Sequence, residues 1–144
     1  MSLEDKAVDS DAPIDERIAA AIRSRLENGR LACAAAGEIA AGLAVAPIEV
    51  GRTADRLQVR LDRCELGLFG YPHRAKGWEI AGIASLPVPD GLEAALRDAG
   101  AGRGEVTCER LSQEARRFSA PLLQVGWLAD RLGLKIRDCP LGAF

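Results

Sequence analysis

The sequence predicts a mainly α-helical protein with small β-hairpins, built from two related repeats. The first observation is the helical spacing of apolar residues near the start, at Ile14, Ile18 and Ile22. The second is a recurrence at an offset of 75 residues, because residues 13–69 and 88–144 share 16 of 57 aligned positions without a gap. A gapless match of this length indicates one supersecondary unit used twice. The longest shared stretches are Ala54–Leu57 with Ala129–Leu132 and Cys64–Phe69 with Cys139–Phe144.

Charge and composition divide the chain into three parts. Residues 1–12 carry one Lys and four acidic residues, and we expect them to form a disordered acidic tail. Residues 13–87 form the first repeat with a hairpin extension, and residues 88–144 form the second repeat. The net charge of the whole chain is −2, so the body is nearly neutral once the tail is set apart. A neutral body is compatible with a local basic patch but does not indicate one.

The hydropathy of the chain favours a cytoplasmic protein. No apolar run is long enough to span a bilayer. The first residues, MSLEDKAVDSDAP, lack the basic and apolar regions of a signal peptide.

The elements of the first repeat follow from spacing and from turn residues. The predicted order is a helix over 13–27, a short strand over 30–33, helices over 35–44 and 48–57, an extended segment over 59–69, and a hairpin that leads into 78–83. The apolar pattern changes phase between Leu61 and Cys64, and again between Ile136 and Cys139. A bulge or a sharp bend at both places would keep the apolar residues against one core.

The two central helices carry a resemblance to a known class of proteins. The pattern Ile39-Ala40-x-x-Leu43-Ala44-Val45-Ala46-Pro47-x-x-Val50-Gly51-Arg52 resembles the helix-turn-helix of bacterial DNA-binding regulators. The order of helix, strand, helix, turn, helix and hairpin resembles a winged helix, so the chain resembles a tandem winged helix-turn-helix protein. The likeness covers about 20 residues per copy, and the turn position usually given to Gly is Ala44 or Ser119 here. In the second copy Ala115, Phe118, Ala120 and Val125 keep only the outline.

This resemblance implies double-stranded DNA as a partner and a role as a small bacterial transcriptional regulator. Arg52, Thr53 and Arg56 would lie on the outer face of the third helix and contact the major groove. Arg60 would follow the DNA backbone nearby. The other interpretation is an ordinary solvated helix face.

The loop after the first repeat is a candidate wing. Residues 71–77 are basic and bounded by turn formers, so Arg74 and Lys76 would contact phosphates or the minor groove. A polar linker between the repeats would have the same composition.

The second repeat suggests a different use. At the positions equivalent to the reading residues it carries Gln124, Trp127, Leu128 and Arg131. An exposed Trp–Leu pair suits a protein surface better than DNA. We therefore expect Trp127, Leu128 and Arg131 to form an interface with a protein partner or a second copy, and a protein–protein adaptor is the alternative function.

The cysteines and the single histidine carry the remaining chemistry. Cys33, Cys64, Cys108 and Cys139 fit no usual zinc or iron–sulfur spacing. If the short strand pairs with the hairpin, the first two would approach each other, as would the last two. They would then be either matching core residues or a thiol- or metal-responsive sensor. His73 has no partner fixed by sequence, so we expect no enzyme, no cofactor and no metal.

Overall fold

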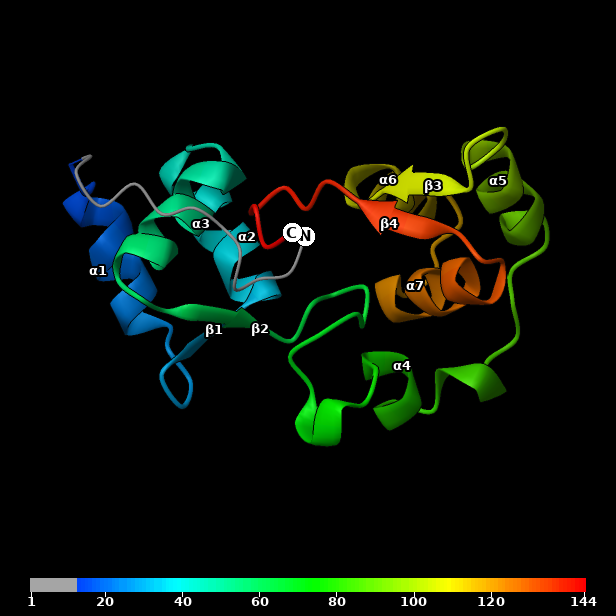
Figure 1. The fold of residues 1–144 in the computed structure, drawn as a ribbon, viewed down its shortest axis with the longest axis horizontal. Coiled ribbons are helices and arrows are strands. Elements are labelled where there is room, and N and C mark those ends of the chain that lie inside the picture. Colours follow the sequence, from blue (N-terminus) through cyan, green and yellow to red (C-terminus); the bar gives the residue numbers. More distant parts are fainter. Residues whose placement is uncertain (1–12) are drawn as a thin grey trace. The chain divides into compact units, whose positions relative to one another are not determined.

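The computed structural model describes residues 13–144, and the predicted acidic tail over residues 1–12 lies outside them. Within the described residues the fold is mainly helical, with seven α-helices, two 3-10 helices and four three-residue strands (Figure 1). The elements form two compact units, which are described separately below.

Unit 1 consists of residues up to 64 together with residues 140–144. Its elements are α1 (Glu16–Ser24), β1 (Arg30–Ala32), α2 (Cys33–Leu43), α3 (Pro47–Arg56) and β2 (Arg60–Asp62). Helix α1 begins after Asp15, whose carboxylate accepts the Arg17 N–H at 2.9 Å. Hydrogen bonds from the side chain and the backbone of Arg17 lower the pKa of Asp15. Ile22, Leu31 and Val50 are fully buried, so the core joins α1, β1 and α3.

Helices α2 and α3 are joined by a tight turn, as are the two helices of a helix-turn-helix motif. Three residues, 44–46, join them, and the chain bends by 117° between the two helices. This angle falls within the range of about 90–120° that is typical of the motif. Ala44 adopts a left-handed conformation with φ 54°, and Pro47 is the first residue of α3. No single described helix is long and apolar enough to cross a membrane, although the bent α2–α3 pair reaches the combined length and hydropathy.

Unit 2 consists of residues 65–139. Its elements are η2 (Pro72–Arg74), α4 (Gly77–Ile80), η3 (Ile83–Ser85), α5 (Leu92–Ala99), β3 (Glu105–Thr107), α6 (Cys108–Arg117), α7 (Leu122–Arg131) and β4 (Lys135–Arg137). Its core includes Leu92 and Leu96 from α5, Leu111 from α6 and Val125 from α7, all fully buried.

The strands of both units pair in parallel, which corrects the expected hairpins. Leu31 lies opposite Leu61 in unit 1, and Val106 lies opposite Ile136 in unit 2. A hairpin turn joins only antiparallel strands, whereas here two helices separate the paired strands and supply the crossover that parallel pairing requires. The predicted hairpin over 78–83 is also wrong, because α4 and η3 occupy this segment.

The bends predicted between Leu61 and Cys64 and between Ile136 and Cys139 are present. They do not keep the apolar residues against one core, because Leu61 belongs to unit 1 and Leu66 to unit 2. Arg63 has φ 43° and Asp138 has φ 57°, so both turn the chain through the left-handed region. The phase change in the apolar pattern is therefore a change in backbone direction.

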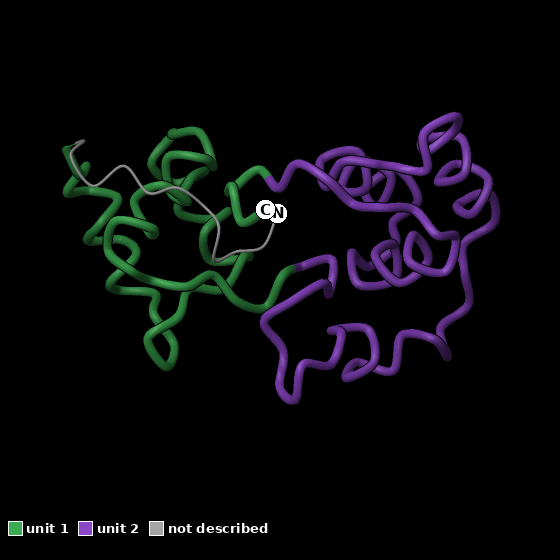
Figure 2. Tube along the Cα trace, in the orientation of Figure 1, with its two compact units in different colours: residues 1–64, 140–144 green, residues 65–139 purple. Residues whose placement is uncertain are grey.

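The compact units do not coincide with residues 13–87 and 88–144. The chain leaves unit 1 after Cys64 and returns to it after Cys139, as the two colours of Figure 2 show. Residues 65–69 therefore belong to the unit that contains α7, and residues 140–144 belong to the unit that contains α3. We call these two stretches the exchanged segments.

Each exchanged segment packs against a helix glycine. A Cβ on Gly51 of α3 would collide with the Leu141 carbonyl, lying 2.7 Å from its carbon. A Cβ on Gly126 of α7 would collide with the Leu66 carbonyl in the same way, lying 2.9 Å from its carbon. The glycines thus let the backbone of each segment approach the helix closely.

Candidate nucleic-acid interface

The open face of α3 carries two arginines and one glutamate. Arg52 keeps 63% of its side-chain surface exposed, and its Nη1 lies 3.2 Å from Glu49 Oε1. Arg56 is half-buried, and its Nη1 donates a hydrogen bond of 2.7 Å to the Pro13 carbonyl. The face is therefore basic, although Glu49 partly offsets its charge.

Thr53 does not lie on this face, which corrects its predicted role. Only 5% of the residue is exposed, and its hydroxyl donates to the Glu49 carbonyl at 2.8 Å. On the helix, Thr53 lies close to Val50 and Ala54, which are fully buried. It is therefore a core residue with a satisfied hydroxyl and is not available to contact a base.

The parallel strands add a basic pair that the sequence reasoning missed. Arg60 of β2 lies directly opposite Arg30 of β1, and both are exposed. The sequence carried no signal for this pair, because the pairing joins residues 30 positions apart across two helices. Arg63 is different, because its guanidinium forms an ion pair with Glu27 and lies 3.5 Å from Asp62. Its hydrogen bond to Glu27 raises the pKa of the guanidinium.

Arg74 and Lys76 belong to unit 2, whereas the α3 arginines belong to unit 1. Arg74 is exposed in η2. Lys76 is half-buried, and its ammonium donates to the Leu68 carbonyl at 3.0 Å and lies 6.0 Å from the centre of the Trp78 ring. Lys76 thus holds the first exchanged segment and has a structural partner of its own.

The predicted Trp–Leu surface on α7 is wrong. Leu128 is 5% exposed and packs in the core at the position equivalent to Thr53. Trp127 is half-buried, with the Arg131 guanidinium 5.1 Å from its ring centre. Gln124 is buried, and its Nε2 donates to the Pro87 carbonyl at 3.0 Å. The outer side of α7 is therefore a cation–π pair rather than an open apolar patch.

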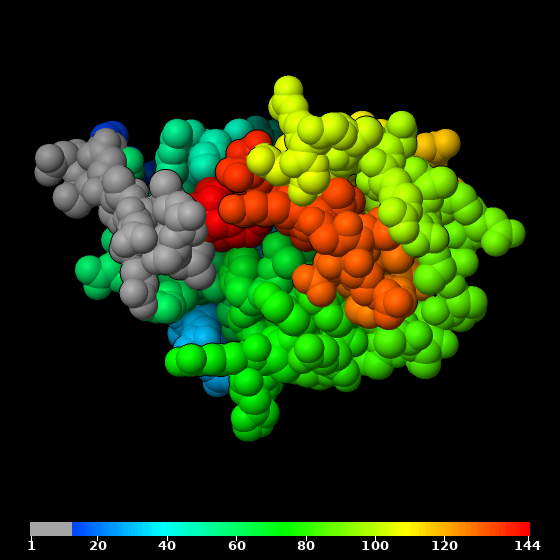
Figure 3. All heavy atoms as spheres, turned by 45° about the vertical axis from the view of Figure 1, so that its right-hand side comes forward, coloured from blue at the N-terminus to red at the C-terminus, as the bar shows by residue number. Residues whose placement is uncertain are grey.

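Large apolar residues are exposed elsewhere in unit 2. Ile80 is 55% exposed, Leu86 43% and Val88 38%. All three lie in or between α4 and the start of α5, a segment that is green in Figure 3. The sequence pattern predicted a hairpin at Ile80 and gave no indication that these residues are exposed.

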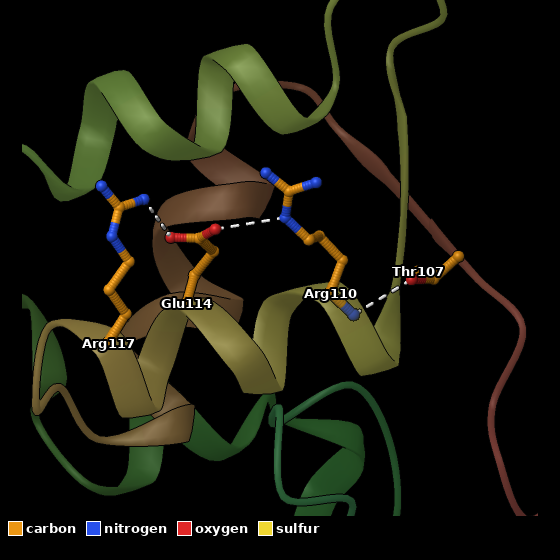
Figure 4. A network of polar contacts seen from close by, with 4 residues as sticks. All are labelled: Thr107, Arg110, Glu114 and Arg117. Carbon is orange, nitrogen blue, oxygen red and sulfur yellow. Dashed lines mark hydrogen bonds and ion pairs between the residues drawn. The ribbon is translucent and has the colours of Figure 1, made fainter.

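A buried carboxylate in α6 has a structural explanation (Figure 4). Glu114 lies at 3.1 Å from Arg110 Nε and at 3.4 Å from Arg117 Nη1, and both arginines reach it from the same helix. Thr107 caps this helix by accepting the Arg110 N–H at 3.0 Å. The carboxylate is thus neutralised by two cations, and the equivalent residue in α2 is the apolar Ile39.

The potential metal ligands among residues 13–144 do not gather at one place. No group of three or more His, Cys, Asp or Glu side chains in this range could hold a metal ion. His73 is exposed in η2. The cysteines lie where the strands end, with Cys33 and Cys108 as the first residues of α2 and α6.

Comparison with known proteins gives no relative. No protein-family model, no curated protein and no solved structure matches the chain. The functional argument therefore rests on the geometry of α2, α3 and the side chains around them.

Proposed function

We propose that this chain binds double-stranded DNA through α2 and α3 of unit 1, as a small bacterial transcriptional regulator. The single observation that supports this proposal most is the 117° bend over a three-residue turn, with Arg52 exposed on the second helix. In a helix-turn-helix the second helix enters the major groove, where arginine is the commonest reader of guanine.

The contact set in this proposal is smaller than the sequence suggests. Arg52 and Arg56 would contact the groove or its phosphates, and Arg60 with Arg30 would contact the backbone. Thr53 is not part of the set because it is buried. No wing is part of it either, because η2, α4 and η3 occupy the segment predicted as the wing hairpin.

We also propose that the two halves of the chain arose by duplication of one helix-turn-helix unit. Strands β3 and β4 follow β1 and β2 at the same offset of 75 residues, and α6 and α7 follow α2 and α3. Left-handed residues recur at that offset too, with Ser119 matching Ala44 and Asp138 matching Arg63. Shared turns that are unfavourable for most residues support a common origin better than shared helices do.

The test is fluorescence anisotropy of a labelled generic duplex, titrated with protein at several salt concentrations. Binding should weaken steeply with salt, because phosphate contacts release counterions. The double variant Arg52→Ala/Arg56→Ala should bind less tightly. If both arginines contact phosphates, the slope of log affinity against log salt should fall by about 1.8.

A matched control separates these contacts from general charge. The variant Arg97→Ala/Arg116→Ala removes the same charge from exposed positions on α5 and α6. It should bind nearly as well as the wild type. Equal losses of affinity in both double variants, with unchanged melting temperatures, would show that binding depends only on net charge. If the wild-type chain did not bind the duplex even at low salt, the proposal would be refuted.

A protein–protein adaptor is the second candidate, and one observation favours it. Ile80, Leu86 and Val88 expose large apolar side chains within nine residues of one another along the chain, and such clustering is common at protein interfaces. An adaptor would show no salt-dependent affinity for a duplex. Self-association measured by sedimentation, and relieved by Ile80→Asp/Leu86→Asp, would favour this candidate.

A further inference from the structure

Two pairs of cysteines lie at the roots of the exchanged segments. Cys64 is the last residue of unit 1 before the chain enters unit 2, and Cys139 is the last residue of unit 2 before the chain returns. Each has a cysteine of its own unit just beyond the end of the partner strand, Cys33 for the first and Cys108 for the second.

The strand register places the members of each pair just beyond adjacent strand ends. Ala32 lies opposite Asp62, so Cys33 follows one paired residue and Cys64 lies two residues beyond the other. Paired residues of neighbouring strands lie about 4.8 Å apart, so Cys33 and Cys64 follow two adjacent strand ends. A disulfide between them requires a Cα separation of about 4.4–6.8 Å. The left-handed turn at Arg63 also ends the strand direction just before Cys64.

The second pair repeats this arrangement. Thr107 lies opposite Arg137, Cys108 follows the first of them, and Cys139 lies two residues beyond the second. Asp138, between Arg137 and Cys139, is left-handed as Arg63 is.

The two members of each pair differ in their surroundings. Cys33 and Cys108 are half-buried and begin helices of 11 and 10 residues. The N-terminus of a helix favours the thiolate, which is the nucleophilic form. Cys64 is buried and Cys139 is half-buried at the ends of the extended segments. Each pair therefore has one thiol suited to attack an oxidant and a second thiol suited to attack the oxidised sulfur.

We propose that Cys33–Cys64 and Cys108–Cys139 are two dithiol sites that a peroxide closes into disulfides. The thiolate of Cys33 attacks one oxygen of hydrogen peroxide, the O–O bond breaks, and the products are a sulfenic acid and, after protonation, one water. The thiol of Cys64 then attacks the sulfenic sulfur, an S–S bond forms, and the hydroxyl leaves as a second water. The two thiols lose two electrons, which the peroxide accepts. Cys108 and Cys139 react in the same way.

Disulfide formation would link the start of each exchanged segment covalently to the junction of a strand and a helix. Cys33 is covalently joined to α2, and Cys64 precedes the segment that packs against Gly126. A disulfide reduces the conformational entropy of the unfolded chain, so the oxidised protein should melt several degrees higher than the reduced protein. This proposal concerns the stability of the fold and does not depend on DNA binding.

The test treats the fully reduced whole chain with a few equivalents of hydrogen peroxide and then blocks remaining thiols. Intact mass spectrometry should show the loss of four hydrogens and no blocked thiol. Digestion without reductant should give two cross-linked peptide pairs, Cys33 with Cys64 and Cys108 with Cys139. The variant Cys33→Ser should lose only two hydrogens and keep the second pair, and Cys108→Ser should keep the first.

The contrary outcomes are equally specific. Cross-links between Cys33 and Cys108, disulfides between two chains, or sulfinic acid at Cys33 without a cross-link would overturn the proposal. If a serine variant fails to fold, the peptide map of the wild-type chain decides the connectivity alone.

Discussion

At the scale of single residues, Gly51 and Gly126 matter most, because each lets a peptide carbonyl touch a helix. In both cases an added Cβ would overlap with backbone atoms, which cannot move aside as a flexible side chain can. The sequence shows that Val-Gly recurs at both places. It does not show why, since the Leu141 and Leu66 carbonyls come from distant parts of the chain.

We predict that Gly51→Ala and Gly126→Ala each destabilise the fold by about 1–3 kcal/mol, through overpacking against the carbonyl. Chemical denaturation gives the change in the free energy of unfolding. Gly37→Ala and Gly42→Ala are the matched controls, since both lie in α2 and a Cβ there meets nothing within 4 Å. These controls should stabilise by up to about 1 kcal/mol. A stabilising Gly51→Ala would mean that Leu141 does not pack there.

Neighbouring residues on α3 show how far a helical pattern can be read. The apolar spacing correctly put Val50 and Ala54 inside, and both are fully buried. It put Thr53 outside because threonine is polar, yet the Glu49 carbonyl satisfies its hydroxyl within the helix. The same outward placement, carried over to α7, predicted that Leu128 is exposed, although it is buried. Burial on the edge of the apolar stripe depends on neighbouring elements, which periodicity alone does not show.

At the scale of elements, the turn between α2 and α3 has an unusual residue at its first position. Ala44 ends α2 in a left-handed conformation with φ 54°, and Ser119 follows α6 at φ 52°. These are the two positions at which the helix-turn-helix pattern usually has glycine. A side chain in this conformation costs about 1 kcal/mol or more, because Cβ approaches the carbonyl oxygen.

Ala44→Gly should therefore stabilise unit 1 by about 1 kcal/mol, offset in part by the greater freedom of glycine in the unfolded chain. Ser119→Gly should do the same for unit 2. Thermal melts of both variants measure the effect. Ala41→Gly, exposed within α2, is the control and should destabilise by about 1 kcal/mol. Equal destabilisation by Ala44→Gly would show that the turn is not left-handed in solution.

The helices were predictable and the strand pairing was not, for a physical reason. Helix α1 lies within its predicted segment, and α2 and α3 begin two residues and one residue before theirs. Apolar spacing places helices this well because helical contacts are local. The strands have only three residues each, which is too few for an alternating pattern to specify a partner. Their pairing is parallel and joins residues 30 positions apart, so it depends on the helices packed between them.

At the scale of the whole molecule, the compact units exchange short segments between the two sequence repeats. Residues 65–69 and 140–144 share Leu-Gly and a terminal Phe. Leu66 and Leu141 are both buried, and Gly67 and Gly142 approach Leu123 and Ile48 respectively, which are equivalent residues of α7 and α3. Because the segments are so alike, the sequence cannot tell whether each packs against its own repeat or against the other.

Substitution of the two leucines distinguishes these arrangements. Leu141→Ala should weaken unit 1, and Leu66→Ala should weaken unit 2, each by about 2–5 kcal/mol as expected for a buried leucine. Hydrogen–deuterium exchange resolves the effect by region. Peptides from α3 should exchange faster in Leu141→Ala and peptides from α7 faster in Leu66→Ala, because the loss of a buried contact opens the unit that contained it. If each segment packed against its own repeat, the pattern would reverse, with Leu66→Ala exposing α3. The two variants control for each other, since they remove the same side chain from equivalent positions.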